Sequence, residues 1–188
     1  ALVFRKKSTT LAELLEAVKA DFVGYEELWA QTRKVPKYGS DDKIANAHVK
    51  RLVSGFDAIV YEKNRPYFEA EGLFLQPCMQ NDTWHLKLGE KCGATADGRR
   101  AGKSFAQNSN PSPGAAINGL TAVLNSLLER PYGELTSGAL NLDVEPKAFK
   151  GESGLNAFAA LLGTYFNRGG LHAQVSAVNV DELEDAQR

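Results

Sequence analysis

Apolar residues near the start of the chain recur three and four positions apart, which is the spacing of one helix face. The first such group is Leu11, Leu14, Leu15 and Val18. Thr9 or Thr10 can cap this helix, and Glu13 stands at the capping-box position relative to Thr10. We therefore predict a helix over residues 11–20.

Two further helical patterns follow. DFVGYEELWAQTRK, residues 21–34, keeps its large apolar residues on one side and should continue the helix until Val35-Pro36 ends it. Residues 40–65 have an acidic start and a basic end, which complements the helix dipole. Their apolar stripe is Ile44, His48, Leu52, Phe56 and Ile59. Residues 1–65 are thus predicted to form a helical layer.

The pattern changes after Pro66. GLFLQPCMQ, residues 72–80, resembles a short buried strand that enters the polar run NDTWH. Residues 89–119 have almost no periodicity and are rich in Gly, Pro, Asn and Ser, which predicts a long loop.

Regular patterns return in the last third of the chain. They predict, in order, a helix over 119–131, a strand over 138–146, a helix over 153–170, a strand over 171–180 and an opening helix with Asp181 as its N-cap. Strands separated by amphipathic helices favour parallel pairing through right-handed crossovers, so the fold class is α/β.

Composition removes several function classes. The net charge of −1 gives no global field for nucleic acid or an anionic membrane, and no apolar run reaches the roughly 20 residues of a spanning helix. The opening ALVFRKKSTT has its apolar residues before its basic ones, the reverse of a signal peptide, so a cytoplasmic protein is expected. The chain starts without Met and stops within a helical pattern, which suggests a piece that is incomplete at both ends.

Candidate chemistry is sparse. Cys78 and Cys92 suit reduced, incidental thiols, although pairing is not excluded by the sequence. The three histidines lack a second metal ligand at helical spacing, so no metal site is predicted. The polar run after the expected strand is the best candidate to line a substrate pocket, the alternative being a solvated strand end. Its members are Gln80, Asn81, Asp82 and His85.

The stretch GATADGRRAG, residues 93–102, holds three glycines and two adjacent arginines. It lacks the Lys-Ser/Thr and the following helix of a phosphate-binding loop, which favours tight turns tied by Asp97 and Arg99. We expect Gly93, Gly98 and Gly102 to permit the turns.

Three stretches together resemble the glycyl radical enzymes of the pyruvate formate-lyase superfamily. They are GATADGRRAG, NPSPGAAINGLTAVLNSL, and the segment from KAFKGESGLNAF to VNVDELEDAQR. Leu120 stands where the family has Pro, and Ala116-Ile117 replace its usual charged pair. TLAELLEAVKADFVGYEEL and KYGSDD are also similar to the family, so the resemblance spans nearly the whole chain.

The resemblance implies a partial set of strands and helices from a ten-stranded α/β barrel, with residues 1–188 as one region and residues 66–188 supplying barrel strands, crossover helices and a wrapping loop. In that family one loop carries a cysteine that becomes a thiyl radical, and an R-V-x-G-Y-type motif carries the glycine radical. Neither cysteine here matches, and the glycine motif is absent, so no catalytic residue is expected in this chain. The motif residues should be structural: Gly93, Asp97, Gly98, Arg99, Gly102, Gly119, Thr121 and Asn125.

The leading hypothesis is a piece of a glycyl radical lyase or dehydratase, or a formate C-acetyltransferase-like enzyme, that is not competent alone. It would cleave a C–C, C–O or C–N bond in a small hydroxylated or carboxylated substrate. No directly bound cofactor is expected; the radical is protein-based, an S-adenosylmethionine-dependent activating enzyme is the implied partner, and a homodimer is possible. Two alternatives remain: a non-catalytic homologue that binds a partner chain, and a free-standing α/β metabolite-binding domain.

Overall fold

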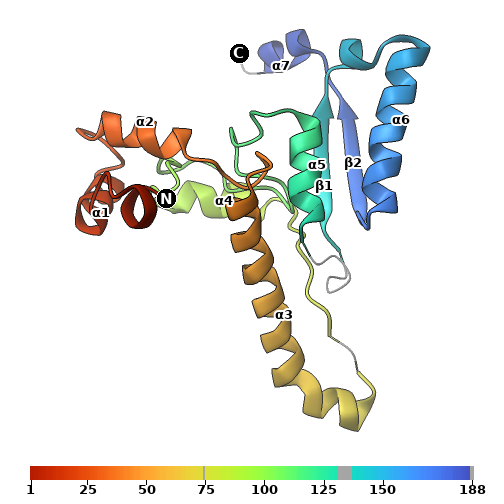
Figure 1. The fold of residues 1–188 in the computed structure, drawn as a ribbon, viewed down its shortest axis with the longest axis horizontal. Coiled ribbons are helices and arrows are strands. Elements are labelled where there is room, and N and C mark those ends of the chain that lie inside the picture. The colour runs from red at the N-terminus through yellow and green to blue at the C-terminus, as the bar shows by residue number, and fades with distance from the viewer. Residues whose placement is uncertain (74, 131–136, 187–188) are drawn as a thin grey trace. The chain divides into compact units, whose positions relative to one another are not determined.

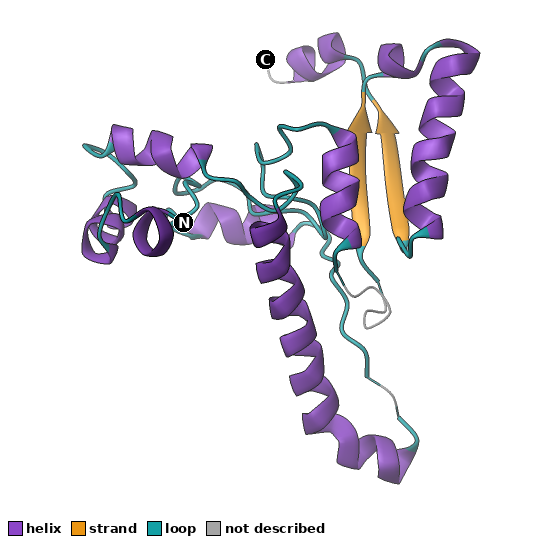
Figure 2. Cartoon of the chain, in the orientation of Figure 1, coloured by secondary structure: helices purple, strands orange, loops and turns teal. Residues whose placement is uncertain are grey.

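The computed structural model describes residues 1–73, 75–130 and 137–186. The chain forms two compact units, each built from two separate stretches of sequence. The first comprises residues 1–37 and 81–106, and the second residues 38–80 and 107–188. Figures 1 and 2 show the elements of both.

The first unit is helical. It contains a short π-helical turn (Leu2–Lys6), α1 (Leu11–Lys19), α2 (Glu26–Lys34) and α4 (Trp84–Lys91). The prediction for α1 is confirmed: the Thr10 hydroxyl accepts a hydrogen bond from the Glu13 amide at 3.1 Å. The Glu13 carboxylate accepts from the Thr9 hydroxyl at 2.6 Å. Both threonines thus hold the first turn.

Residues 21–25 do not continue the helix as predicted. α2 begins at Glu26, and Asp21 and Phe22 have φ of 49° and 58°. This turn places Phe22 fully inside the small core of the unit, against residues such as Ala17 and Leu28. Burial of the ring offsets the cost of left-handed backbone at two residues with side chains. The predicted end at Val35 is confirmed.

In the second unit, α3 (Lys43–Glu71) runs through Pro66, so the boundary predicted after Pro66 is wrong. The helix surface around Glu62 is exposed, and water can therefore solvate the carbonyl that proline leaves unpaired. The predicted apolar stripe is also not the buried face in the described residues. Leu52 and Phe56 are 72% and 58% exposed, whereas Val53 is buried.

The strand predicted over residues 72–80 is wrong as well. Apart from residue 74, which lies outside the described residues, this segment is irregular and contributes a single parallel bridge between Cys78 and Ser137. The polar run that follows leads into α4, which the sequence pattern did not predict. The rest of the predicted loop, residues 92–119, has no helix or strand.

The predicted α-β-α-β succession is confirmed. α5 (Leu120–Leu128), β1 (Ala139–Val144), a 3₁₀ turn (Pro146–Phe149), α6 (Gly151–Asn167) and β2 (His172–Ala177) follow in order. β1 and β2 pair in parallel, with Asn141 opposite Gln174. α7 (Val180–Ala186) begins one residue before Asp181, which lies in its first turn and is not the predicted N-cap; residues 187–188 of that prediction lie outside the described residues.

The core of the second unit lies between the sheet and its helices. Leu140 and Leu142 of β1 pack with Leu127 of α5 and Tyr165 of α6, and Val53 of α3 joins the same cluster. Leu127 and Leu140 are fully buried. Figure 1 shows α5 beside β1 and α6 beside β2. Burial of Leu140 and Leu142 of β1 therefore fixes which face of the sheet meets the helices.

Candidate functional site

The two faces of the β1–β2 sheet differ in chemistry. The side chains of successive strand residues alternate between faces, so Leu140, Leu142 and Val144 share the helix-covered face. The opposite side, here called the polar face, carries the alternate residues of both strands. These are Ala139, Asn141, Asp143, His172, Gln174 and Ser176. In an α/β barrel the helices cover the outer face of the strands, so the face without helices lines the inside.

Three amide side chains join across this face. Asn108 Nδ2 donates to Asn141 Oδ1 at 2.6 Å. Asn141 Nδ2 donates to Gln174 Oε1 at 3.1 Å. We call Asn108, Asn141 and Gln174 the amide chain. Because each amide both accepts and donates, the three side chains orient one another.

The edge of β1 is closed by residues that precede α5. The Asn110 side chain donates to the Asn141 carbonyl at 2.7 Å and accepts from the Asn141 amide at 2.9 Å. The Ser109 amide donates to the Ala139 carbonyl at 3.0 Å. Asn110 thus replaces a neighbouring strand with its side chain, and it fixes the backbone of the residue at the centre of the amide chain.

The sequence-predicted pocket residues do not share one unit. Gln80 accepts from the Ser137 hydroxyl at 3.0 Å in the second unit. Asn81 and His85 belong to the first unit, where the Asn81 Oδ1 and His85 Nδ1 atoms are 2.8 Å apart across the start of α4. Asp82 is exposed. His85 lies on a helix, and the strand end on which its predicted role depended is absent from the described part of the segment.

Arg99 is the centre of the GATADGRRAG loop. It is 9% exposed, and its guanidinium donates to the carbonyls of Gly93, Arg100 and Lys103. Its Cζ lies 4.2 Å from the centroid of the Phe105 ring. Asp97 accepts from the Thr95 hydroxyl and the Arg99 amide. Gly98 and Gly102 have φ of 93° and 73°, whereas Gly93 has no positive φ and contributes only its carbonyl.

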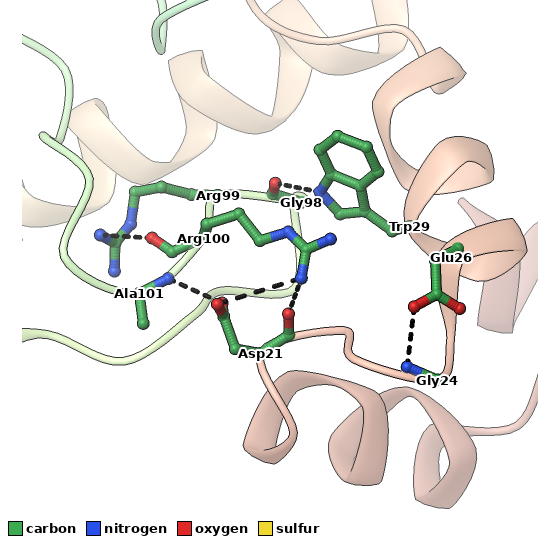
Figure 3. Close-up of polar contacts among 8 residues, drawn as sticks. All are labelled: Asp21, Gly24, Glu26, Trp29, Gly98, Arg99, Arg100 and Ala101. Carbon is green, nitrogen blue, oxygen red and sulfur yellow. Dashed lines mark hydrogen bonds and ion pairs between the residues drawn. The ribbon is translucent and has the colours of Figure 1, made fainter.

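Arg100 faces the other way and joins the loop to the α1–α2 turn, as Figure 3 shows. Its guanidinium donates to the Asp21 carbonyl and lies 4.7 Å from the Trp29 ring centroid. The Asp21 carboxylate accepts from the Ala101 amide at 2.8 Å, and the Trp29 indole donates to the Gly98 carbonyl at 2.9 Å. These contacts use the polar groups of the loop for docking within its own unit.

The remaining motif residues lie around α5. Gly119 precedes the helix with φ of 82°. Asn125 donates to the Asp41 carboxylate at 2.9 Å and accepts from Arg168 at 3.3 Å. Thr121 and Asn125 line a groove of about 310 Å³ between α5 and α6 with mostly apolar walls, including Leu124, Leu161 and Tyr165. Asn125 therefore links α5 to Asp41, which lies just before α3, and to Arg168 at the end of α6.

Hydrogen bonds, charge and burial shift the pKa values of Glu26, Lys37 and Lys19. The amide of Gly24 donates to Glu26, which lowers the pKa of that carboxyl. Burial lowers the pKa of Lys37, whose ammonium donates to the Thr32 carbonyl at 2.7 Å. A hydrogen bond and the charge of Glu16 raise the pKa of Lys19.

Other site classes have no support among the described residues. Cys78 and Cys92 are free and exposed there. In the same residues, no group of three His, Cys, Asp or Glu side chains is placed to hold a metal ion. No described helix is long and apolar enough to cross a membrane. The polar face itself carries hydrogen-bonding amide groups.

The polar face was not predicted, although its signal is in the sequence. ALNLDV and HAQVSA alternate apolar and polar residues, which is the pattern of strands with one apolar and one polar face. Asn108 and Asn110 carry no such signal, because they lie in the aperiodic stretch that precedes α5.

Comparison with known proteins assigns the chain to a family. The pyruvate formate lyase-like family matches residues 1–77, and the glycine radical family matches residues 105–188. Isethionate sulfite-lyase of Nitratidesulfovibrio vulgaris is 31% identical over 100% of this chain and 22% of its own length. Trans-4-hydroxy-L-proline dehydratase of Clostridioides difficile is 32% identical over 99% of this chain and 23% of its own.

A solved structure agrees. The glycerol-bound form of the B12-independent glycerol dehydratase from Clostridium butyricum matches with a TM-score of 0.82 and 27% identity, over 99% of this chain and 23% of that one. The chain thus spans less than a quarter of the length of these relatives. Its helices and parallel strands are a partial set from the α/β barrel of the family. Both matched families and these relatives show that the chain belongs to the glycyl radical enzymes of the pyruvate formate-lyase superfamily.

Proposed function

We propose that the chain supplies part of the wall of the reaction chamber in a glycyl radical lyase or dehydratase. Such an enzyme cleaves a C–C, C–O or C–N bond in a small hydroxylated or carboxylated substrate. The observation that carries this proposal is the polar face of the β1–β2 sheet, opposite the face that α5 and α6 cover. In an α/β barrel the helices lie outside, so the face without helices points to the interior.

The names of the relatives support the reaction class. They are a sulfite-lyase and two dehydratases, and the substrates that their names give are small and hydroxylated. A wall of amide and hydroxyl groups suits such substrates, because each group can donate to or accept from a hydroxyl. A closed wall also keeps water and other hydrogen donors away from a radical.

The radical chemistry belongs to the intact enzyme in this proposal. The 188 residues contain no Arg-Val-x-Gly-Tyr sequence, and neither cysteine matches the one that the family uses. We therefore expect this chain to be inactive alone. In the intact protein we expect a protein-based glycyl radical, a cytoplasmic location and activation by an S-adenosylmethionine-dependent enzyme with an iron–sulfur cluster.

Electron paramagnetic resonance of the intact protein after anaerobic activation tests this function. We expect a glycyl radical signal, and no signal from the 188-residue chain treated in the same way. A silent spectrum of the activated intact protein, under conditions in which a known glycyl radical enzyme gives a signal, would remove the proposal.

A separate experiment tests the pocket residues predicted from the sequence, which are Gln80, Asn81, Asp82 and His85. Asp82→Ala in the intact enzyme should lower kcat/KM at least 10-fold if this carboxylate contacts substrate. Unchanged turnover would exclude Asp82 from the pocket. Glu90→Ala, at another exposed position of the same segment, is the matched control and should leave turnover unchanged.

A further inference from the structure

The amide chain has a direction. Asn108 donates to Asn141, and Asn141 donates to Gln174. Gln174 Oε1 is therefore occupied, while Gln174 Nε2 has no partner among the described residues. The amide chain therefore ends in the Nε2 donor of Gln174, an exposed side chain of β2. Because hydrogen-bonded amides polarise one another, this terminal donor is stronger than an isolated glutamine amide.

Backbone contacts of Asn141 and the register of the sheet fix the orientation of the amide chain. Asn110 holds the amide and carbonyl of Asn141 on the edge of β1. The register of the sheet then sets Gln174 directly opposite Asn141. A donor held in this way loses little rotamer freedom when a ligand binds, which is the property expected of a residue that positions substrate.

The charge on the polar face limits what the donor can bind. β1 and β2 contain no Lys or Arg, and Asp143 is the acidic residue of the face. Carboxylates and sulfonates are bound mainly by Arg or Lys, and the Asp143 carboxylate opposes them. A neutral hydroxyl needs only one donor and one acceptor, and Gln174 with its neighbour Ser176 supplies both.

We propose that Gln174 Nε2 donates a hydrogen bond to a neutral hydroxyl oxygen of the substrate, and that the substrate is an uncharged diol or polyol. Asn141 and Asn108 act as positioning residues through Gln174. This inference rests on the proposed function, because it places the polar face inside the reaction chamber.

The test uses the intact, activated enzyme with ethane-1,2-diol, propane-1,2-diol and glycerol as neutral probes, and isethionate and trans-4-hydroxy-L-proline as charged probes. We expect kcat/KM for at least one neutral diol to exceed that for either charged probe by about 10-fold or more. Gln174→Met should raise KM for that diol about 10-fold with an unchanged radical yield.

Asn141→Asp tests the positioning role. The new carboxylate can accept but not donate, so Gln174 would turn its N–H toward it and present Oε1 to the substrate. We expect a similar rise in KM with the same radical yield. Asn156→Asp, on the exposed surface of α6, is the matched control and should leave KM unchanged.

The outcomes separate the two proposals. An absent radical signal refutes the proposed function itself. A radical-bearing enzyme that consumes a charged probe but no neutral diol, or none of the five probes, overturns this inference and leaves the function standing. An unchanged KM in Gln174→Met also overturns it. Thermal unfolding of each variant shows whether a change in KM comes from lost folding instead, in which case Tm would fall with it.

Discussion

The GATADGRRAG loop and the polar face of the sheet are both rich in hydrogen-bonding groups, but they use them in different ways. In the loop, Arg99 binds three carbonyls of its own segment and Arg100 binds the Asp21 carbonyl. On the polar face, three amides orient one another, and the last of them, Gln174, keeps a donor without a partner in the described structure.

The loop residues that identify the family are thus not the residues that present the Gln174 hydrogen-bond donor. The loop carries a motif that identifies the family, yet Arg99 stabilises its turns and Arg100 contacts the α1–α2 turn and α2 (Figure 3). The polar face also includes a strand, β2, from a segment that resembles the family, and there it presents a pre-oriented donor. A motif can therefore be diagnostic because the fold needs it, while the reactive surface depends on which polar atoms folding leaves available.

Replacement of Arg99 should have the largest effect on stability. Arg99→Ala removes a buried guanidinium that binds three carbonyls and should lower the free energy of unfolding by about 3 kcal/mol. Urea unfolding measures it. Arg51→Ala, at an exposed position of α3, should change it by less than about 0.5 kcal/mol. A similar small change for Arg99 would mean that the loop does not depend on its central guanidinium.

The two loop glycines Gly98 and Gly93 should differ. In Gly98→Ala the new Cβ would lie 2.6 Å from Thr32 Oγ1, at a φ of 93° that side chains disfavour. Thr32 cannot easily move, because its hydroxyl donates to the Trp29 carbonyl. We expect a loss of about 2 kcal/mol. Gly93→Ala meets open space and is the control; equal losses in urea unfolding would contradict this geometry.

In the region of the polar face, replacement of Asn110 should lower stability, whereas replacement of Gln174 should affect mainly substrate binding. Asn110→Ala removes two hydrogen bonds to the Asn141 backbone and should cost about 1–2 kcal/mol in urea unfolding. Gln174→Met removes one exposed contact and should cost less than about 0.5 kcal/mol. If Gln174→Met proves the more destabilising variant, the amide chain supports the sheet and does not present a donor.

The smallest expected effect is a pH dependence of stability that arises from Glu26 of α2. Because the Gly24 amide lowers the pKa of Glu26 below its ordinary 4.5, this group stabilises the fold above its unfolded pKa. That contribution is lost as the pH falls through the folded pKa. Glu26→Gln should therefore flatten the decline of the urea midpoint between neutral pH and pH 3. A parallel decline in both proteins would show that the Gly24 contact is too weak to matter.

The sequence predicted the elements that have a clear period and failed where tertiary contacts override it. α1, α5, β1, α6 and β2 are confirmed. The turn at Asp21 and Phe22 was missed because burial of one aromatic ring outweighs local helix propensity. α4 was missed because WHLKLGEK has no clear apolar stripe. The strand over residues 72–80 was inferred from apolar content alone, which does not separate a strand from an irregular segment.

By itself the sequence determined the family and the alternation of helix and strand, because glycine-arginine turns and periodic patterns are local features. Only the tertiary structure decided which strand face meets the helices and how Asn108, Asn110, Asn141 and Gln174 come together. These residues are up to 66 positions apart, from 108 to 174. Their hydrogen bonds form only after burial of Leu140, Leu142 and Tyr165 has set the register of the sheet, so no local pattern encodes them.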